Sequence, residues 1–217
     1  MKKLPRSFYN RNTIEVAAQL LGCQIICNTD GIKTGGIIVE TEAYRGPDDP
    51  ACHAFKGHTR RNDVMYGQPG FLYVYFTYGN HFMLNVVTEK KGFPAAVLLR
   101  GIEPLYNIEI MAKRRGTDEL TNISSGPGKL AKAFNVTVPD NGTDLTGSYI
   151  YILGPPDNKP KIIASPRIGI GIAGSERLWR LYIDGNLYVS QPNKWIRESS
   201  YSLSEAKKLG FVLPKER

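Results

Sequence analysis

The chain has 217 residues, of which 41% are hydrophobic and 22% charged, and these values exclude an intrinsically disordered chain. It is long enough to fold without disulfides or metals. Its three cysteines include no Cys-x-x-Cys pair, which excludes a disulfide scaffold and argues against a structural zinc site. The net charge is +8: residues 1–39 carry +3, residues 40–112 carry −1, residues 113–158 carry 0 and residues 159–217 carry +6. Basic ends around a less basic centre suit a polyanion that is held at its rim.

The N-terminus, MKKLPRSFYN, is basic but has no hydrophobic stretch behind it, unlike a signal peptide. No apolar run approaches the roughly 18 residues that a membrane-spanning helix needs. We therefore expect a protein that is not secreted, does not enter a membrane and keeps its thiols reduced in the cytoplasm or nucleus.

The first predicted element is a helix over residues 13–21. Asn12 can cap this helix, Glu15 stands three residues on as in a capping box, and Gly22 follows its end. Apolar runs rich in β-branched and aromatic residues then predict strands at residues 23–27, 36–44, 71–78, 82–88 and 96–102.

The second half of the chain mixes helices and strands. We predict helices at 105–115 and 126–134, the latter opening with Gly-Pro, and strands at 149–153, 167–172 and 179–183. A last helix over 203–209 opens with Ser202-x-x-Glu205 and closes at Gly210. Helices near the ends and strands in the middle indicate an α+β fold, and without a long linker we expect one domain over residues 1–217.

The strand GIIVETEAY begins apolar and then carries two glutamates. Glu40 and Glu42 are two residues apart and so lie on one face. Burial of a carboxylate at the end of a strand is destabilising unless the carboxylate is paired or takes part in a reaction. One interpretation is therefore that both glutamates face solvent as a polar stripe. The nearby Tyr44, Asp48 and His53 instead favour a functional site.

The segment FLYVYFTYGNHFMLNVV predicts a hairpin. Strict alternation puts Tyr73 and Tyr75 on one strand face, and Tyr78 lies at a tight turn on Gly79 and Asn80. These tyrosines can pack in the core of an ordinary hairpin. The functional alternative is that Tyr78 acts as a wedge that enters a base stack.

Arg100 is an isolated cation within the apolar strand AAVLLRGIEP. A buried arginine needs a carboxylate partner, and we consider Glu42 and Glu103 as candidates. The pair is either a structural salt bridge or part of a functional site.

Two glycine motifs do not indicate a nucleotide cofactor. Gly169, Gly171 and Gly174 match the dinucleotide pattern G-x-G-x-x-G, but a strand follows instead of a helix. The segment SGPGKL lacks phosphate-loop spacing. It is better interpreted as a helix N-terminus at which main-chain N–H groups and Lys129 can hold one phosphate.

The ordered motifs of the chain resemble the 3-methyladenine DNA glycosylase family, of the alkyladenine or methylpurine type, over about residues 8–190. They are ETEAY (40–44), YVYFTYG (73–79) with Asn85, LLRGIEP (98–104), SGPGKL (125–130) and RIGIGIAG (167–174). The resemblance implies one compact domain with a curved antiparallel sheet, flanking helices and a protruding β-hairpin that enters DNA. It also implies hydrolysis of the N-glycosidic bond of damaged purines, without a metal or an organic cofactor.

Three residues carry over as the catalytic set. Glu42 matches the family's general base, which takes a proton from the water that attacks the sugar C1′. Arg100 matches the arginine that helps to hold this water and keeps Glu42 ionised. The main-chain carbonyl of Ile168 matches the third anchor of the water.

Further residues carry over as a base pocket. Tyr44, His53 and Tyr75 match aromatic walls around the flipped base, whose electron-rich rings favour a cationic methylated purine. Asn85 matches the residue that crowds the purine 2-position, and the same pocket should include Ala51 and Leu98.

The remaining residues are expected to contact the DNA. Tyr78 matches the wedge that fills the gap left by the flipped nucleotide. Backbone contacts are expected from Thr59, Arg60, Arg61, Asn62, Lys129 and Gly169.

The implied partner is double-stranded DNA with alkylated or deaminated purines, and the implied protein is a monomer that works at the nucleoid or in the nucleus. Lesions considered are 3-methyladenine, 7-methylguanine, hypoxanthine and ethenoadenine. No amine nucleophile is among the matched residues, so a monofunctional hydrolase without lyase activity is expected.

Two alternatives remain open. One is a non-catalytic single-strand nucleic-acid-binding module in which the tyrosines stack bases. The other is a metal-dependent nuclease that uses Glu40, Glu42, Asp48 and His53. His58 and His81 are further candidate ligands, although no histidine pair has helical ligand spacing.

Overall fold

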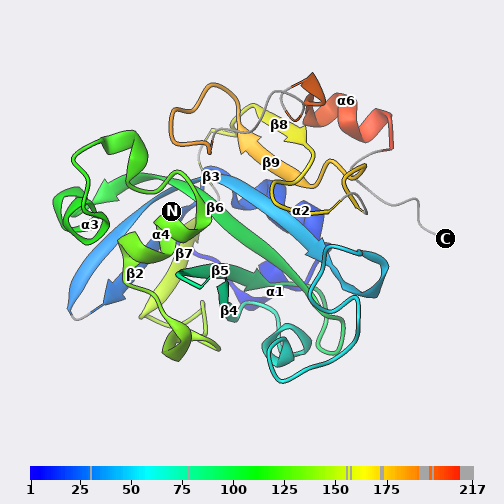
Figure 1. The fold of residues 1–217 in the computed structure, drawn as a ribbon, viewed down its shortest axis with the longest axis horizontal. Helices are drawn as coiled ribbons and strands as arrows, with labels where there is room; N and C mark the ends of the chain where they lie inside the picture. Colours follow the sequence, from blue (N-terminus) through cyan, green and yellow to red (C-terminus); the bar gives the residue numbers. More distant parts are fainter. Residues whose placement is uncertain are drawn as a thin grey trace.

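An antiparallel sheet organises the chain (Figure 1). The computed structural model describes residues 1–29, 31–77, 79–154, 156, 158–171, 174–190, 196 and 198–210. Within these residues the sheet has ten strands, and its main path runs β1-β7-β2-β3-β6-β5-β4. A branch leaves β3 through β9 to β8 and β10. Helices pack on this sheet, so the architecture is α+β, as predicted.

The strands are β1 (Lys2–Lys3), β2 (Gln24–Thr29), β3 (Ile32–Arg45), β4 (Leu72–Thr77), β5 (His81–Val87), β6 (Ala95–Tyr106), β7 (Ile150–Gly154), β8 (Ile162–Ser165), β9 (Arg180–Ile183) and β10 (Tyr201–Ser202). The helices are α1 (Arg6–Tyr9), α2 (Thr13–Leu20), α3 (Ile108–Arg115), α4 (Pro127–Phe134) and α6 (Leu203–Lys208). Single 3-10 turns occupy Gly46–Asp48, Asp63–Tyr66, Leu120–Asn122 and Val138–Asp140.

The long strand β3 connects the two parts of the sheet. It pairs with β6 from Gly35 to Arg45, with β2 along its first half, and with β9 from Glu40 to Glu42. The stretch with the two glutamates therefore lies between β6 and β9. Register shifts against β6 occur on both sides of Glu40, and such irregularities re-aim side chains.

Helix α2 begins where the sequence predicts. The Asn12 side chain accepts the N–H of Ile14 and so caps the helix. The carboxylate at this terminus comes from Glu89, which accepts the N–H of Thr13 at 3.0 Å. Glu15 itself is exposed. A negative charge near the helix N-terminus is favourable because it faces the positive end of the helix dipole.

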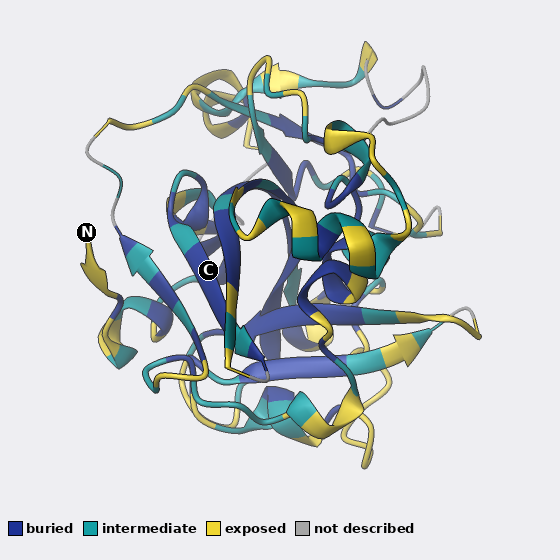
Figure 2. Cartoon of the chain, turned by 90° about the vertical axis from the view of Figure 1, so that its left-hand side faces the viewer, coloured by how far each residue is buried: buried dark blue, intermediate teal, exposed yellow. Residues whose placement is uncertain are grey.

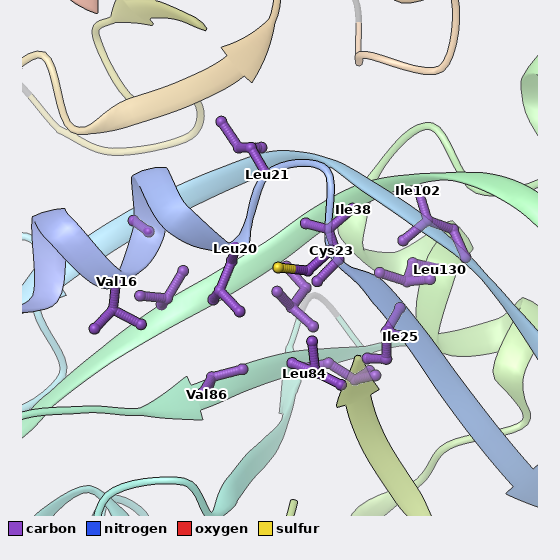
Figure 3. Packing of buried hydrophobic residues seen from close by; sticks show 14 of the residues in the cluster. Val16, Leu20, Leu21, Cys23, Ile25, Ile38, Leu84, Val86, Ile102 and Leu130 are labelled. Atoms are coloured by element: carbon purple, nitrogen blue, oxygen red, sulfur yellow. The ribbon is translucent and has the colours of Figure 1, made fainter. Parts of the chain in front are cut away.

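The main core lies between α2 and the sheet. Apolar side chains of α2, among them Val16 and Leu20, pack with Ile38 of β3 and with Leu84 and Val86 of β5 (Figure 3). The strands are buried along most of their length, while exposed residues gather on loops and on outer helix surfaces (Figure 2). Burial of this kind supplies most of the free energy that favours folding.

The three cysteines are free and belong to these buried clusters. Cys23 and Cys27 lie in the main core, and Cys52 lies in a smaller cluster with Tyr73 and Met65. Burial raises the pKa of the Cys23 thiol to about 12 and those of Cys27 and Cys52 to about 11.

Most predicted elements are confirmed within a few residues. The last helix has the predicted capping box between Ser202 and Glu205, and Gly210 follows it with φ 76°. The helix predicted over 105–115 begins later, at Ile108, because β6 continues through Tyr106. The short elements β1, α1, β8 and β10 were not predicted.

The strand predicted over residues 167–172 is wrong for its described part, residues 167–171, which pair with no strand. The N–H of Ile168 bonds to the Glu42 carboxylate instead of to a neighbouring strand. Gly169 has φ 76°, which breaks the extended conformation. Residues 167–171 therefore form no strand, although their sequence alternates between apolar residues and glycine.

No helix in the described ranges has the length and apolarity to cross a bilayer.

Gly36 tests the close approach of β3 and β6. A Cβ at this position would overlap the carbonyl oxygen of Glu103. We expect Gly36→Ala to lower the free energy of unfolding by roughly 1–3 kcal/mol, as overpacking does. The control is Gly171→Ala, where a Cβ meets no atom within 4 Å. Urea unfolding measures both variants, and equal stability would contradict the proposed steric constraint.

Candidate active site

A cavity of about 330 Å³ opens between β3, the β4–β5 hairpin, β6 and the segment after β8. Its volume falls within the roughly 300–1,000 Å³ of small-molecule sites. The residues predicted for a base pocket all line it: Tyr44, Ala51, His53, Tyr75, Asn85 and Leu98. Arg100, Ile168 and Gly169 line it as well. Further lining residues, which the sequence did not indicate as a set, are Met65, Tyr73, Thr77, Met83, Ala96, Pro127 and Ile170.

Glu42 is fully buried beside this cavity. Its Oε1 accepts the N–H of Ile168 at 2.7 Å, and its Oε2 accepts the Tyr44 hydroxyl at 2.8 Å. Arg100 Nη1 lies 3.3 Å from Oε2. All three partners line the cavity, so the carboxylate lies directly behind its lining residues. A carboxylate held in this way next to a cavity is a candidate general base.

Arg100 contacts two carboxylates. Its Nε donates to Glu40 Oε1 at 3.0 Å, while Nη1 faces Glu42. Glu103, the other predicted partner, is not involved: it accepts from the Asn186 side chain. The pKa of Arg100 lies above its ordinary value, because the two glutamates outweigh the opposing effect of burial.

His53 and the tyrosines of β4 form an aromatic wall. The His53 ring lies 4.5 Å from the Tyr75 ring, edge to face, and its Nδ1 is 3.0 Å from the Tyr73 hydroxyl. Removal from bulk water and repulsion by Arg61 lower the pKa of His53 to about 4, so the imidazole is neutral at pH 7. The Arg61 guanidinium lies 5.1 Å from the Tyr75 ring centre.

Tyr44 rests on a buried ion pair. The Arg167 guanidinium lies 4.7 Å from the Tyr44 ring centre and donates to both Asp49 oxygens at 2.6 and 2.7 Å. Both charged side chains are fully buried. This bidentate pair joins the loop that carries Ala51 and His53 to the segment that follows β8. Burial raises the pKa of Tyr44, and the neighbouring Glu42 raises it further.

The residues expected at the DNA backbone have different environments. Thr59, Arg60, Arg61 and Gly169 are exposed. Asn62 is 1% exposed, and its side chain holds the loop together by accepting the Thr59 N–H and donating to two carbonyls. Its side chain is therefore not placed to reach a phosphate, which corrects that expectation.

Lys129 donates to Asn122 and is half-buried in α4, which starts at the predicted Gly126-Pro127. Tyr78 lies outside the described residues, although the strands on either side of it pair from Leu72 with Val86 to Thr77 with His81.

The histidines do not lie together. His58 pairs with Asp63 on the surface, and a Cβ on Gly128 would touch the ring of His81. In the part of the chain that the structure describes, no three residues among His, Cys, Asp and Glu are grouped as metal ligands. Of the acids proposed for a nuclease, Asp48 is exposed and pairs with Arg45.

Sequence reasoning missed the buried pair between Asp49 and Arg167 and the role of Glu40 as a partner of Arg100. A charged residue followed by apolar alternation, as in RIGIGI, was the available signal for Arg167. The signal for Tyr73 was its two-residue spacing from Tyr75, which places both side chains on the cavity face.

Comparison with known proteins yields consistent matches. A family model described as methylpurine-DNA glycosylase matches residues 7–187. A protein of Chlorobaculum tepidum is 46% identical over 193 residues, covering 88% of this chain and 92% of its own. A protein of Methanocella arvoryzae is 48% identical over 195 residues, with 88% and 97% covered. One of Carboxydothermus hydrogenoformans is 45% identical over 190 residues, with 87% and 98% covered. All three are provisionally named 3-methyladenine DNA glycosylase.

The Asp49–Arg167 pair predicts a large stability effect. Asp49→Asn leaves a buried guanidinium without its charge partner, so we expect a loss of roughly 3–5 kcal/mol in the free energy of unfolding. The double variant with Arg167→Met should regain most of this loss. The control is Asp48→Asn in the exposed pair with Arg45, where we expect about 0–1 kcal/mol. Denaturant unfolding that shows equal effects for Asp49 and Asp48 would refute this assignment.

His53 predicts a defined pH dependence. Its folded-state pKa of about 4 lies below its ordinary 6.5, so its contribution to stability is complete above pH 6.5 and is lost as the pH falls toward 4. We expect NMR titration of the imidazole to show a neutral ring at pH 6. Arg61→Gln should raise this pKa, and Arg60→Gln should leave it unchanged. Titration of His53 at or above 6.5 would exclude this environment.

Proposed function

Because this chain belongs to the methylpurine-DNA glycosylase family, we propose that it removes damaged purines from double-stranded DNA by hydrolysis. The supporting observation is the buried Glu42 carboxylate, which is held by Arg100, Tyr44 and the Ile168 N–H at the wall of an aromatic cavity. In this proposal residues 1–217 act as one domain, as a monomer, in base excision repair at the nucleoid or in the nucleus.

The cavity receives the damaged base after it has rotated out of the duplex. Tyr44 packs against one side of the base, and His53 and Tyr75 against the other. Electron-rich rings attract a positively charged base such as 7-methylguanine or 3-methyladenine. The neutral imidazole of His53 adds no opposing cation. Asn85, Ala51 and Leu98 limit the shape of the base.

Glu42 acts as the general base. It takes a proton from a water whose oxygen bonds to the sugar C1′, while the electron pair of the N-glycosidic bond leaves with the base. Arg100 pairs with the carboxylate, and Arg100 and the Ile168 carbonyl help to hold the water. A methylated purine departs readily because it is already cationic. Hypoxanthine and ethenoadenine additionally need a proton from a pocket donor or a bound water.

The reaction leaves an intact strand with an abasic site. Among the described residues that line the cavity there is no lysine, so no amine is placed to attack C1′. We therefore propose a monofunctional glycosylase without lyase activity and without a cofactor.

DNA is held by residues beside the cavity. Tyr78, which lies between β4 and β5 in the sequence, fills the space left by the flipped nucleotide. Thr59, Arg60 and Arg61 contact phosphates, and so do the Gly169 N–H and Lys129.

Base release under single-turnover conditions tests this function. Duplexes with 7-methylguanine, 3-methyladenine, hypoxanthine or ethenoadenine are compared with undamaged DNA, with EDTA present. We expect lesion-specific release that Glu42→Gln slows by about 100-fold or more, the range typical for loss of a general base. The control is Glu103→Gln, which changes a glutamate on β6 that bonds to Asn186.

Other outcomes separate the alternatives. Equal release by wild type and Glu42→Gln would disprove the mechanism. Cleavage of undamaged strands that EDTA abolishes would instead support a nuclease. Tight, lesion-independent binding of single strands without any release would favour a binding module.

A further inference from the structure

A second buried glutamate lies behind the candidate general base. Glu40 is fully buried, and of its partners Arg100, Arg180 and Ser190 only Arg100 lines the cavity. We propose that Glu40 is a positioning residue that orients Arg100 toward Glu42, a role that rests on the glycosylase function proposed above. Its action on the reaction passes through the Arg100 guanidinium.

The first argument is the geometry of Arg100. A guanidinium is planar and rigid, so fixing one edge fixes the direction of the others. Glu40 holds the Nε edge at 3.0 Å, and this leaves Nη1 at 3.3 Å from Glu42 Oε2. Without Glu40, the guanidinium would keep its contact with Glu42 and the 3.3 Å hydrogen bond from Nη2 to the Ser190 hydroxyl, but no other described residue would fix its Nε edge.

The second argument is that Glu40 is anchored independently of Arg100. Arg180 Nε donates to Glu40 Oε1 at 2.6 Å. The Ser190 N–H donates to Oε2 at 2.8 Å, and the Ser190 hydroxyl donates to Oε1 at 2.7 Å. These contacts come from β9 and from the segment after it, so two parts of the fold fix the carboxylate without Arg100. Burial raises the pKa of Glu40, but Arg100, Arg180 and Ser190 lower it more.

The third argument excludes Glu40 as the base. Both of its oxygens already accept hydrogen bonds, from four donor atoms in total: Arg100 Nε, Arg180 Nε, and the Ser190 N and Oγ. A carboxylate offers about four acceptor sites, so four donors leave Glu40 little capacity for a water. Among the described residues, Glu42 accepts hydrogen bonds only from the Ile168 N–H and the Tyr44 hydroxyl, with Arg100 Nη1 at 3.3 Å, and these three partners line the cavity.

The fourth argument is charge balance. Glu40 and Glu42 together carry two negative charges, and Arg100 and Arg180 carry two positive charges, all in the fully or almost fully buried state. Removal of one charged group leaves an uncompensated buried charge of the opposite sign.

Ser190 lies beyond the end of the family match at residue 187. One of the residues that hold Glu40 in this chain is therefore outside the matched region.

The test is a double-mutant cycle on the rate of base release. We expect Glu40→Gln to slow single-turnover release from 7-methylguanine DNA by on the order of 10- to 100-fold, as small misplacements of catalytic groups do. Binding to duplex with a non-hydrolysable abasic-site analogue should stay within about twofold, on the order of 0.4 kcal/mol. In the Arg100→Gln background, Glu40→Gln should cause no further slowing, because the group it orients is gone.

Two further variants keep the test decisive. Glu103→Gln is the matched control and should release base at the wild-type rate. Ser190→Ala removes a hydroxyl that donates to Glu40 Oε1 and also accepts from Arg100 Nη2 at 3.3 Å, so it disturbs both members of the network and should slow release several-fold only when Arg100 is present. If Glu40→Gln does not fold, Glu40→Asp, which keeps the charge but shortens the side chain that reaches Arg100, takes its place in the cycle.

The outcomes distinguish this inference from the proposed function. Slowing by Glu40→Gln that persists unchanged in the Arg100→Gln background would overturn the positioning role and indicate a general structural one. A wild-type rate in Glu40→Gln, together with loss of release in Glu42→Gln, would overturn the positioning role alone. No release by the wild type from any lesion would instead remove the glycosylase function itself.

Discussion

The structure depends on the burial of two carboxylates of one strand between guanidinium groups of its neighbours. Glu40 and Glu42 of β3 are fully buried, and this is tolerable only because β6 brings Arg100 and β9 brings Arg180 within contact. The branched sheet is what makes this possible, because β3 exchanges its neighbour β2 for β9 at that point. The same ionic cluster joins three strands of the sheet and fixes the position of the Glu42 carboxylate.

The charged side chains at and behind the cavity lining are paired with one another. Arg100, the charged residue among those that line the cavity, is paired with Glu40 and Glu42, and the other described lining residues are aromatic, apolar or uncharged polar. Arg167 behind Tyr44 is neutralised by Asp49, and His53 is held uncharged by its surroundings. Under the proposed function, these compensated charges leave the aromatic rings as the main attraction for a cationic base.

The sequence predicts those features that depend on neighbouring residues. The cap at Asn12 and the capping box at Ser202 act within one helical turn, so local patterns identify them. The cavity residues were predicted as a set only from the resemblance to the glycosylase family. Features that depend on contacts between distant residues were missed. Arg100 pairs with Glu40 where the register between β3 and β6 shifts. Residues 167–171 form no strand, because Arg167 binds Asp49 and the Ile168 N–H binds Glu42. The local pattern marks Arg167 as a charge before an apolar run, but it names neither Asp49 nor Glu40 as a partner.

The buried cysteines give the protein a chemical property suited to its family. Thiolates react with electrophiles far faster than thiols do, and alkylating agents that damage purines are electrophiles. Cys23, Cys27 and Cys52 are inaccessible, and their raised pKa values keep them protonated. The thiols of this chain are therefore poor targets for the agents whose DNA lesions the family removes, so the fold should remain intact during the exposure that makes repair necessary.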